Sequence, residues 1–299
     1  MIKSFLLNVY DKQYKKLLVF SFLVLFFCIG LLLVSYATTG EFIDKGVSLK
    51  GGLTLTVPVD KHFVMSDVEH QLAERFPSGD IAVREITEAG NPKALIIEAA
   101  DVPSEEIQAF LPQLGIALRE GEFTVENMGS ALGNQFFSQT IKAVIFAFIA
   151  MAVVVFITFR SVVPSSFVIL AAASDIICTL AVINLLGVRL STAGIAAFLM
   201  LIGYSVDSDI LLTSRVLKRK NEGGLLERIL GAMKTGVTMT GTAIIAVFIG
   251  LVFTQSDTIR QIMLIVFIGL LFDLIFTWFQ NAGILRWYIE RKEAKHGQN

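Results

Sequence analysis

Three aspartates lie inside long apolar runs of this sequence, where charged residues are rare: Asp175, Asp207 and Asp273. A fourth, Asp209, follows Asp207 by two residues. A charged carboxylate near the centre of a lipid bilayer costs roughly 2.5 to 3.5 kcal/mol on insertion scales, so each of these residues needs either a partner or a function. The function open to such a group is reversible proton binding. We expect Asp175 and Asp207 to form a proton relay.

The alternative is that each carboxyl is held neutral and hydrogen-bonds a neighbouring helix as part of the packing. The sequence leaves both interpretations open for Asp175, Asp207 and Asp273. Three carboxylates in one small helix bundle exceed what packing requires. The number of aspartates therefore favours the relay.

Helical geometry separates the two neighbouring aspartates. Residues two apart on a helix point about 200° away from each other, so Asp207 and Asp209 cannot face the same neighbour. Gly203 lies one turn before Asp207, and small residues let helices approach closely. We therefore expect Gly203 at a helix-packing contact, Asp207 inside the bundle, and Asp209 nearer the membrane interface, close to Lys218 or Arg219.

Further polar residues are expected to support the relay. Asp175 shares its helical face with small and weakly polar residues, including Cys178 and Thr179, and Asp273 shares its face with Thr277 and Gln280. A basic residue followed by threonines marks an entrance from the cytoplasm, and each threonine can hydrogen-bond back to a carbonyl of its own helix. The supporting set is Asp209, Asp273, Lys234, Arg215, Thr179 and Thr238.

The amino-acid composition indicates whether the chain is surrounded by water or by lipid. Hydrophobic residues make up 54% of the 299 residues and charged residues 17%, and the mean hydropathy is +0.69. This is too apolar for a soluble chain of this length and predicts an integral membrane protein. The formal net charge of −1 gives no electrostatic argument for nucleic acid. We expect no catalytic group, no cofactor and no metal site, and we interpret Cys28 and Cys178 as apolar filler.

Six stretches are long and apolar enough to cross the hydrocarbon, which takes about 20 residues. They are residues 17–36, 141–159, 165–186, 192–212, 237–253 and 259–285. The first exceeds the usual apolar core of a secretory signal peptide and no small-residue cleavage site follows it, so we interpret it as a retained anchor.

Lysine and arginine give the orientation, because they collect on the cytoplasmic side. The short connections on the other side hold only Arg189 and Arg260, whereas a much larger set of cations collects on one side. These are Lys3, Lys12, Lys15, Lys16, Arg160, Arg215, Lys218, Arg219, Lys220, Arg228, Lys234, Arg286, Arg291, Lys292 and Lys295. We predict a multi-pass protein of the cytoplasmic (plasma) membrane with both termini in the cytoplasm. Residues of about 40–137 are then extracytoplasmic, with seven Lys and Arg against sixteen Asp and Glu.

The segment outside the membrane alternates strand and helix patterns. Residues 53–57, 81–88, 94–99 and 122–127 have strand character, with helices expected from Ser66 to about Phe76 and from Ser104 to Leu114. The order β-α-β-β-α-β is typical of a ferredoxin-like domain. The predicted fold is a polytopic α-helical membrane protein of six transmembrane helices plus one extracytoplasmic α+β (ferredoxin-like βαββαβ) domain between helices 1 and 2.

This organisation gives four parts. Residues 1–39 form the cytoplasmic N-terminus and first span, and residues 40–137 form the extracytoplasmic domain. Residues 138–286 hold spans two to six, and residues 287–299 form a cytoplasmic tail.

Two spans carry a family resemblance. Ser-Asp-Ile-Ile-Cys-Thr at 174–179 and Ile-Gly-Tyr-Ser-Val-Asp-Ser-Asp at 202–209, leading to Arg215, resemble the SecF family of protein-export membrane proteins within the resistance-nodulation-division superfamily. The similarity extends to Lys-Gly-Gly at 50–52 after the first span and to the basic-then-threonine entrance at 234–242. It covers essentially the whole chain.

The resemblance implies an accessory subunit of the Sec pathway. Such a subunit acts with SecD and the Sec translocon (the SecY complex) to move unfolded, translocating polypeptides outward with the proton gradient, and its third-span and fourth-span polar residues form the proton path. That role falls here on Asp175 and Asp207. The chain departs from bacterial members at Ser174, at residues 206–209 and at Lys234. At the first two of these it resembles the SecD pattern and archaeal members of the SecF family more closely.

Two other functions stay open: a proton-driven exporter of small molecules or lipids from the same superfamily, and a structural partner of the translocon without coupled transport. An outer segment of about 98 residues with one βαββαβ unit is small for enclosing an exported molecule, which favours the secretion subunit. Because six helices with midplane carboxylates match half of a pseudo-symmetric transporter, we expect a partner of similar topology to cover the face of spans four and six, with membrane lipid around the rest.

Overall fold

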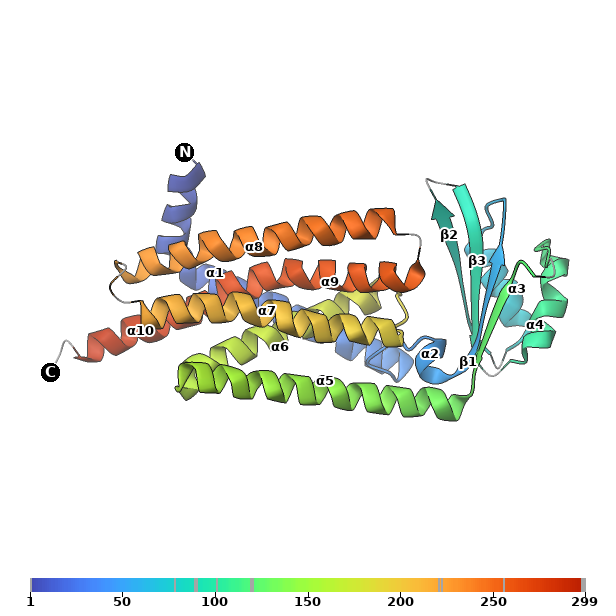
Figure 1. Ribbon diagram of the computed structural model, residues 1–299, viewed down its shortest axis with the longest axis horizontal. Helices are drawn as coiled ribbons and strands as arrows, with labels where there is room; N and C mark the ends of the chain where they lie inside the picture. The colour runs from blue at the N-terminus through green and yellow to red at the C-terminus, as the bar shows by residue number, and fades with distance from the viewer. Residues whose placement is uncertain are drawn as a thin grey trace.

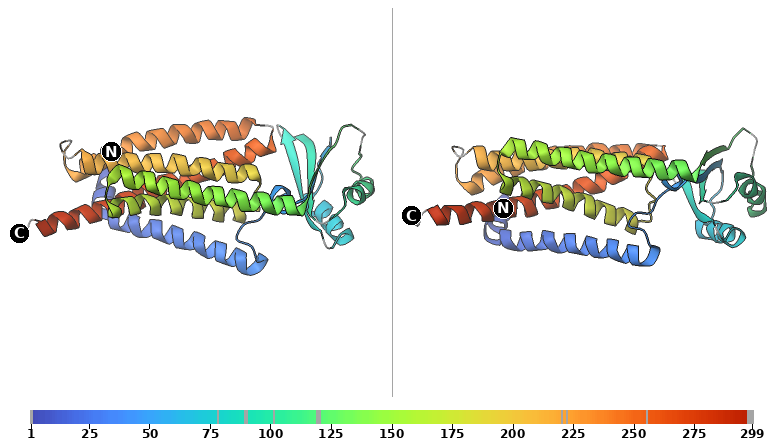
Figure 2. Two further views of the ribbon diagram at one scale, coloured as in Figure 1. Left: turned by 60° about the horizontal axis from the view of Figure 1, so that its bottom comes forward. Right: turned by 90° about the horizontal axis from the view of Figure 1, so that it is seen from below.

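The computed structural model describes residues 2–77, 79–88, 91–100, 102–118, 121–219, 221, 223–254 and 256–296. Lys220, which we count among the cytoplasmic cations, lies outside these residues. The described chain forms an elongated helix bundle with a small sheet domain at one end and both termini at the other (Figure 1). Two further views show the same long bundle from other sides (Figure 2).

Six helices of the described chain are long and apolar enough to cross a membrane, which confirms the predicted number. The bundle elements are α1 (Ile2–Thr39), α5 (Ser130–Phe159), α6 (Val162–Leu185), α7 (Thr192–Lys218), α8 (Leu225–Phe253) and α9 (Asp257–Ile275). The last span does not stop at α9, because the chain continues through a π-helical turn, η2 (Phe276–Asn281), into α10 (Ala282–His296).

The helices differ in how much of their surface they bury. Within an apolar stretch of 18 residues in each span, only 11–17% of the residues are buried in α1, α5 and α8. In α6, α7 and the last span 50–56% of them are buried. Large apolar side chains such as Phe26, Phe146 and Phe253 are exposed on the first group. Helices that are apolar on every face and expose apolar side chains on the outside of the bundle are typical of membrane proteins. The inner helices α6, α7 and α9 therefore form the core, and α7 packs against α5, α6, α8 and α9.

The sheet domain follows α1 through a short helix, α2 (Val47–Lys50). Its strands and helices are β1 (Gly52–Pro58), α3 (Met65–Arg75), β2 (Asp80–Glu88), β3 (Asn91–Ala100), α4 (Ser104–Phe110) with a 3₁₀ turn, η1 (Leu111–Leu114), and β4 (Thr124–Met128). The strand order is β2-β3-β1-β4 and every neighbouring pair is antiparallel. This is the arrangement of the predicted βαββαβ unit, which is confirmed.

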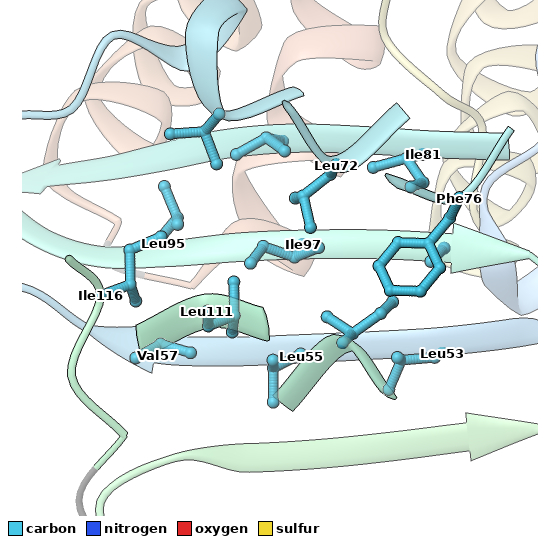
Figure 3. Packing of buried hydrophobic residues seen from close by; sticks show 14 of the residues in the cluster. Leu53, Leu55, Val57, Leu72, Phe76, Ile81, Leu95, Ile97, Leu111 and Ile116 are labelled. Carbon is cyan, nitrogen blue, oxygen red and sulfur yellow. The ribbon is translucent and has the colours of Figure 1, made fainter. Parts of the chain in front are cut away.

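Alternation along the strands builds the core of this domain. Leu53, Leu55 and Val57 of β1 point to one face and are almost completely buried, and Leu95 and Ile97 of β3 join them. Figure 3 shows these side chains beneath residues from both helical segments. One face of the sheet is therefore covered by helices, as the period of two in the sequence predicts.

Two glycines allow the backbone to cross closely where the sheet domain meets the bundle. Gly52 has φ of 130°, and a Cβ there would lie 2.4 Å from the carbonyl oxygen of Ala99. Gly133, in the first turns of α5, would place a Cβ 2.4 Å from the backbone nitrogen of Gly51. Only glycine fits both positions without a shift of backbone. Glycine at positions 52 and 133 is therefore a requirement of these close approaches.

Ion pairs also join the sheet domain to the bundle. Asp80, at the start of β2, lies 2.8 Å from Arg189 of the α6–α7 loop and 3.0 Å from Lys50. Lys50 also lies 3.8 Å from Glu41. Burial acts to raise the pKa of the Asp80 carboxyl, but the hydrogen bonds and charges of Lys50 and Arg189 outweigh it and hold this pKa below its ordinary value.

A buried carboxylate cluster in the helix bundle

Asp175 lies in the middle of α6 and is completely buried. The hydroxyl of Ser205, on α7, donates a hydrogen bond to its Oδ2. Its Oδ1 is buried without a hydrogen-bond partner among the described residues. The neighbours on the same face, Cys178 and Thr179, are also fully buried, so the predicted face of α6 is confirmed.

Asp209 of α7 is the second completely buried carboxylate. The side-chain amide of Asn281 donates to its Oδ1 at 2.7 Å. Its Oδ2 is buried and unpartnered within the described chain. This hydrogen bond joins α7 to the turn η2 (Phe276–Asn281), which is 72 residues away in the sequence.

Asp273 of α9 is the third. Thr277 donates to its Oδ1 at 3.0 Å and Thr240, on α8, donates to its Oδ2 at 3.3 Å. The Thr240 hydroxyl also lies 3.3 Å from that of Ser208, on α7. Asp273 therefore connects α9 to α8 directly and to α7 through a shared hydroxyl.

The π-helical turn η2 supplies the polar residues around the cluster. It follows Asp273 closely and buries Thr277, Gln280 and Asn281 completely. A π-turn inserts one extra residue per turn and changes which side chains face inward, and such turns are frequent at functional sites. Both polar atoms of the Gln280 side chain and the Oδ1 of Asn281 have no hydrogen-bond partner among the described residues.

The three carboxylates gather around one face of α7. Ser205 of α7 donates a hydrogen bond to Asp175, and Asp209 lies one turn further along the same face. Ser208, also on α7, lies 3.3 Å from the Thr240 hydroxyl that donates to Asp273. Within the part of the chain that the structure describes, no ion pair joins any of the three to a lysine or arginine, and every ion pair lies elsewhere. Anions buried together without a cation are costly, whereas a bound proton removes the charge and turns an acceptor into a donor. This arrangement can bind and release protons.

The predicted placement of the two neighbouring aspartates is wrong. Asp207 is exposed on the surface of the bundle, and Asp209 is the inward residue. Gly203 is exposed too, and a Cβ added there would meet nothing within 4 Å, so it makes no helix-packing contact in this chain. The reason is that Gly203 and Asp207 share a helical face, as expected, but that face points outward.

The supporting residues divide between the cluster and its surroundings. Thr179 lies on the Asp175 face, fully buried, with its hydroxyl unpartnered within the described residues. Thr238 donates back to the carbonyl of Lys234 at 2.8 Å, which is the expected local bond, and both side chains are exposed. Arg215 donates to Thr235 at 3.3 Å. Lys234, Arg215 and Thr238 therefore lie outside the contacts of the cluster.

Sequence reasoning missed the hydroxyl and amide partners. Ser205, Ser208, Asp209 and Leu212 repeat at intervals of three and four, and all four are buried. That spacing marks one helical face and was available as a signal for the inward side of α7. Asn281 had no such signal, because its direction depends on the π-turn.

Residues 118–291 match the family model described as protein export membrane protein SecD/SecF, C-terminal. The protein-export membrane protein SecF of Methanothermobacter thermautotrophicus is 42% identical over 270 residues, with 88% of each chain covered. The chain belongs to the SecF family. The SecF protein of Pyrococcus furiosus is 36% identical with 98% of this chain and 97% of that one covered, and these relatives bear out the archaeal resemblance.

Solved structures agree with the SecF fold. SecDF from Thermus thermophilus, described as a translocon-associated membrane protein, superposes with a TM-score of 0.73 at 17% identity over 92% of this chain. The SecDF structure in its super-membrane-facing form gives a TM-score of 0.56 at 16% identity. This chain spans 38% and 40% of the length of those two chains.

Proposed function

We propose that this SecF-family chain is an accessory subunit of protein export that uses the proton gradient across the cytoplasmic membrane, with Asp175, Asp209 and Asp273 as the proton-binding groups. The observation that carries the proposal is the burial of these three carboxylates in the bundle core without a basic partner in the described chain. Intramembrane ionisable residues that face a bundle interior are typical of proton pathways.

Proton binding in this cluster has a mechanical consequence. The carboxylates lie on α6, α7 and α9, and their hydrogen bonds reach α8 and the π-turn as well. A proton on Asp209 removes an acceptor lone pair and adds an O–H donor beside Asn281, whose Oδ1 has no hydrogen-bond partner among the described residues. The preferred contacts between helices then change, because each protonation state satisfies a different set of hydrogen bonds.

One face of α7 is exposed along the bundle, and this exposure supports the proposal of a protein partner within the membrane. Met200 and Tyr204 are 41% and 44% exposed on the face that also carries Gly203 and Asp207. A carboxylate at this depth is costly against lipid, so this face needs a cover. A SecD chain of similar topology is the proposed cover, since the matching solved structures are SecDF chains that extend well beyond the part this chain spans. The Sec translocon, the SecY complex, and the translocating polypeptide are the further proposed partners.

The proposed orientation places both termini in the cytoplasm and the sheet domain outside. Its support is the gathering of lysine and arginine at one end of the bundle and the acidic composition of the segment at the other. A cysteine at the exposed Glu74 of α3 should react with an impermeant thiol reagent in intact cells, whereas one at Lys234 should not. The reverse pattern contradicts the orientation.

Export into inverted membrane vesicles tests the function. Vesicles containing this chain and its SecD partner should translocate an unfolded secretory protein faster when a proton gradient is imposed, and vesicles without this chain should lose that stimulation. If the gradient stimulates both preparations equally, the chain does not couple export to protons and a structural role in the translocon is left.

A further inference from the structure

A pocket of about 430 Å³ opens at the end of the bundle that lies opposite the sheet domain. It lies between the end of α7, the first turn of α8 and the last turns of α10. Its lining consists of Val216, Leu217, Arg228, Tyr288, Ile289, Lys292 and Glu293. Ligand sites in proteins commonly have volumes of about 300 to 1,000 Å³, so this pocket is large enough for a small polar group with attached hydrocarbon.

Arg228 is the least exposed charged residue of the lining, at 8% of its surface. Its Nη1 donates a hydrogen bond to the carbonyl oxygen of Val216, near the end of α7. Its Nε is buried with no hydrogen-bond partner among the described residues. A guanidinium has five N–H groups, so capping one carbonyl of α7 accounts for only part of its donor capacity. Because buried charges in proteins are as a rule paired, an anion is the expected further partner of this guanidinium.

The other lining groups divide into a basic side and an apolar side. Lys292 adds a second positive charge and Glu293 one negative charge, which leaves the lining with one net positive charge. Tyr288 brings a hydroxyl, and its ring is held by an edge contact with Phe167 at 5.9 Å between centroids. Val216, Leu217 and Ile289 are apolar. The pocket thus offers cations and hydrocarbon surface together.

The position of the pocket along the membrane spans fits the same ligand. The fourth span ends at Lys218, the fifth begins at Leu225 and the sixth extends to Ala294. In the proposed orientation these three span ends reach the cytoplasmic face of the membrane, which puts the pocket at the level of the lipid headgroups. Basic pockets between transmembrane helices at this level recognise the headgroups of anionic lipids.

We infer that this pocket binds the phosphate of an anionic membrane phospholipid. Arg228 and Lys292 contact the phosphate oxygens, and Val216, Leu217 and Ile289 lie against the start of the lipid chains. Guanidinium groups suit phosphate because their planar fork can donate two parallel hydrogen bonds. The apolar half of the pocket favours a lipid over free inorganic phosphate, since an inorganic ion leaves that surface in contact with water.

Lipid retention by the purified full-length chain tests the site. The chain is exchanged into mild detergent with phosphatidylglycerol or with phosphatidylcholine, and bound lipid is counted by native mass spectrometry. The wild-type chain should retain phosphatidylglycerol preferentially, and Lys292→Gln should weaken that retention about fivefold, the contribution expected of one basic residue at an anionic membrane surface. Arg228→Gln should weaken it at least as much.

Arg291→Gln is the matched control, because Arg291 is adjacent on the same helix but does not line the pocket. It should leave phosphatidylglycerol retention unchanged. If Arg228→Gln fails to accumulate, Lys292→Gln decides, since Lys292 is exposed. Equal retention of the two lipids by the wild type, or equal loss in Lys292→Gln and Arg291→Gln, overturns the site. A further experiment compares inorganic phosphate with phosphatidylglycerol. If inorganic phosphate raises the melting temperature of the chain as much as phosphatidylglycerol does, the lipid site is also overturned.

Discussion

The carboxylates at the sheet-domain junction and those in the bundle core have opposite surroundings. Asp80 lies between Lys50 and Arg189 at 3.0 and 2.8 Å and is partly exposed to water. Asp209 in the core is completely buried, receives one amide hydrogen bond and has no cation among the described residues. Both sites involve the helices α6 and α7. Asp80 pairs with Arg189 in the loop between them, and the core cluster includes a carboxylate from each of the two helices.

The difference separates two uses of the same side chain. A cation beside a carboxylate stabilises the ionised form at all ordinary pH values, so the junction keeps one charge state and fixes one geometry. A carboxylate without a cation in an apolar interior is not held ionised, because desolvation disfavours its charge, and its hydrogen bonds change when it binds a proton. The junction therefore acts as a fixed joint, while the core cluster is the part that can change state.

The largest expected effect comes from removing the titratable group in the core. Asp209→Asn and Asp175→Asn are nearly isosteric and keep a side-chain acceptor, so both chains should fold and accumulate normally. Each should lose the whole gradient-stimulated part of export into inverted vesicles, because the amide binds no proton. Export in the absence of a gradient should be unchanged.

Asp60→Asn, on the exposed surface of the sheet domain, is the control for that experiment. It should behave like the wild type with and without the gradient. A stimulated rate in Asp209→Asn equal to that of the wild type contradicts the role of the cluster, as does a loss that follows only from a lower amount of protein.

The next effect in size concerns the backbone crossing at the junction. Gly52→Ala adds a Cβ 2.4 Å from the Ala99 carbonyl oxygen at a φ of 130°, so the sheet domain should lose at least about 2 kcal/mol of stability. Gly121→Ala also has positive φ, at 83°, but meets nothing within 4 Å, and should cost only about 1 kcal/mol. Limited proteolysis and thermal unfolding measure both; equal costs show that the close approach to Ala99 is unimportant.

A smaller effect is expected from the ion pairs at the junction. Asp80→Asn should cost about 0.5 to 1 kcal/mol near neutral pH, a value reduced by solvent screening because the Asp80 side chain is 42% exposed. Since its pKa is lowered in the folded chain, this contribution is present above the ordinary carboxyl pKa and is lost as the pH falls through the lowered value. Thermal unfolding of both chains across this acidic range should show the difference shrinking. A difference that is constant with pH refutes the ion pairs as its source.

The smallest effect is expected for Asp207→Asn in the isolated chain. Asp207 is exposed, so the melting temperature of the purified protein should change by less than for Asp80→Asn. Co-purification with the SecD partner should fall instead, because the substitution lies on the face that the partner covers. A large loss of stability in the isolated chain would show that Asp207 makes internal contacts after all.

The fold was largely predictable because its signals are local and periodic. Alternation in residues 53–57 and the long apolar runs give the sheet domain and all six spans, since period and length alone determine these elements. The ion pair of Asp80 with Arg189 was not predictable. It joins residues 109 positions apart, and no local pattern indicates which loop meets which strand.

The site was predictable in its residue types and partly in its geometry. Asp175 was expected on a face suited to helix packing and Asp273 on a face that points into protein or water, and both side chains are completely buried. For α7 the small residue Gly203 suggested the packed face, whereas the serines at 205 and 208 mark the true one. Small residues permit close packing but do not require it, while buried hydroxyls need partners, so the hydroxyls are the stronger indicator. The side chain of Asn281 points inward because of the π-helical turn, and no sequence pattern predicts that turn.

Infrared difference spectroscopy of the purified chain tests the central claim most directly, because a protonated carboxyl has a C=O stretching band that an ionised one lacks. Spectra of the wild type at a series of pH values should show such a band from buried aspartate that rises and falls reversibly. The band should diminish in Asp175→Asn, Asp209→Asn and Asp273→Asn and persist in Asp207→Asn. A band that is identical in the wild type and in all three core variants would contradict proton binding by the cluster.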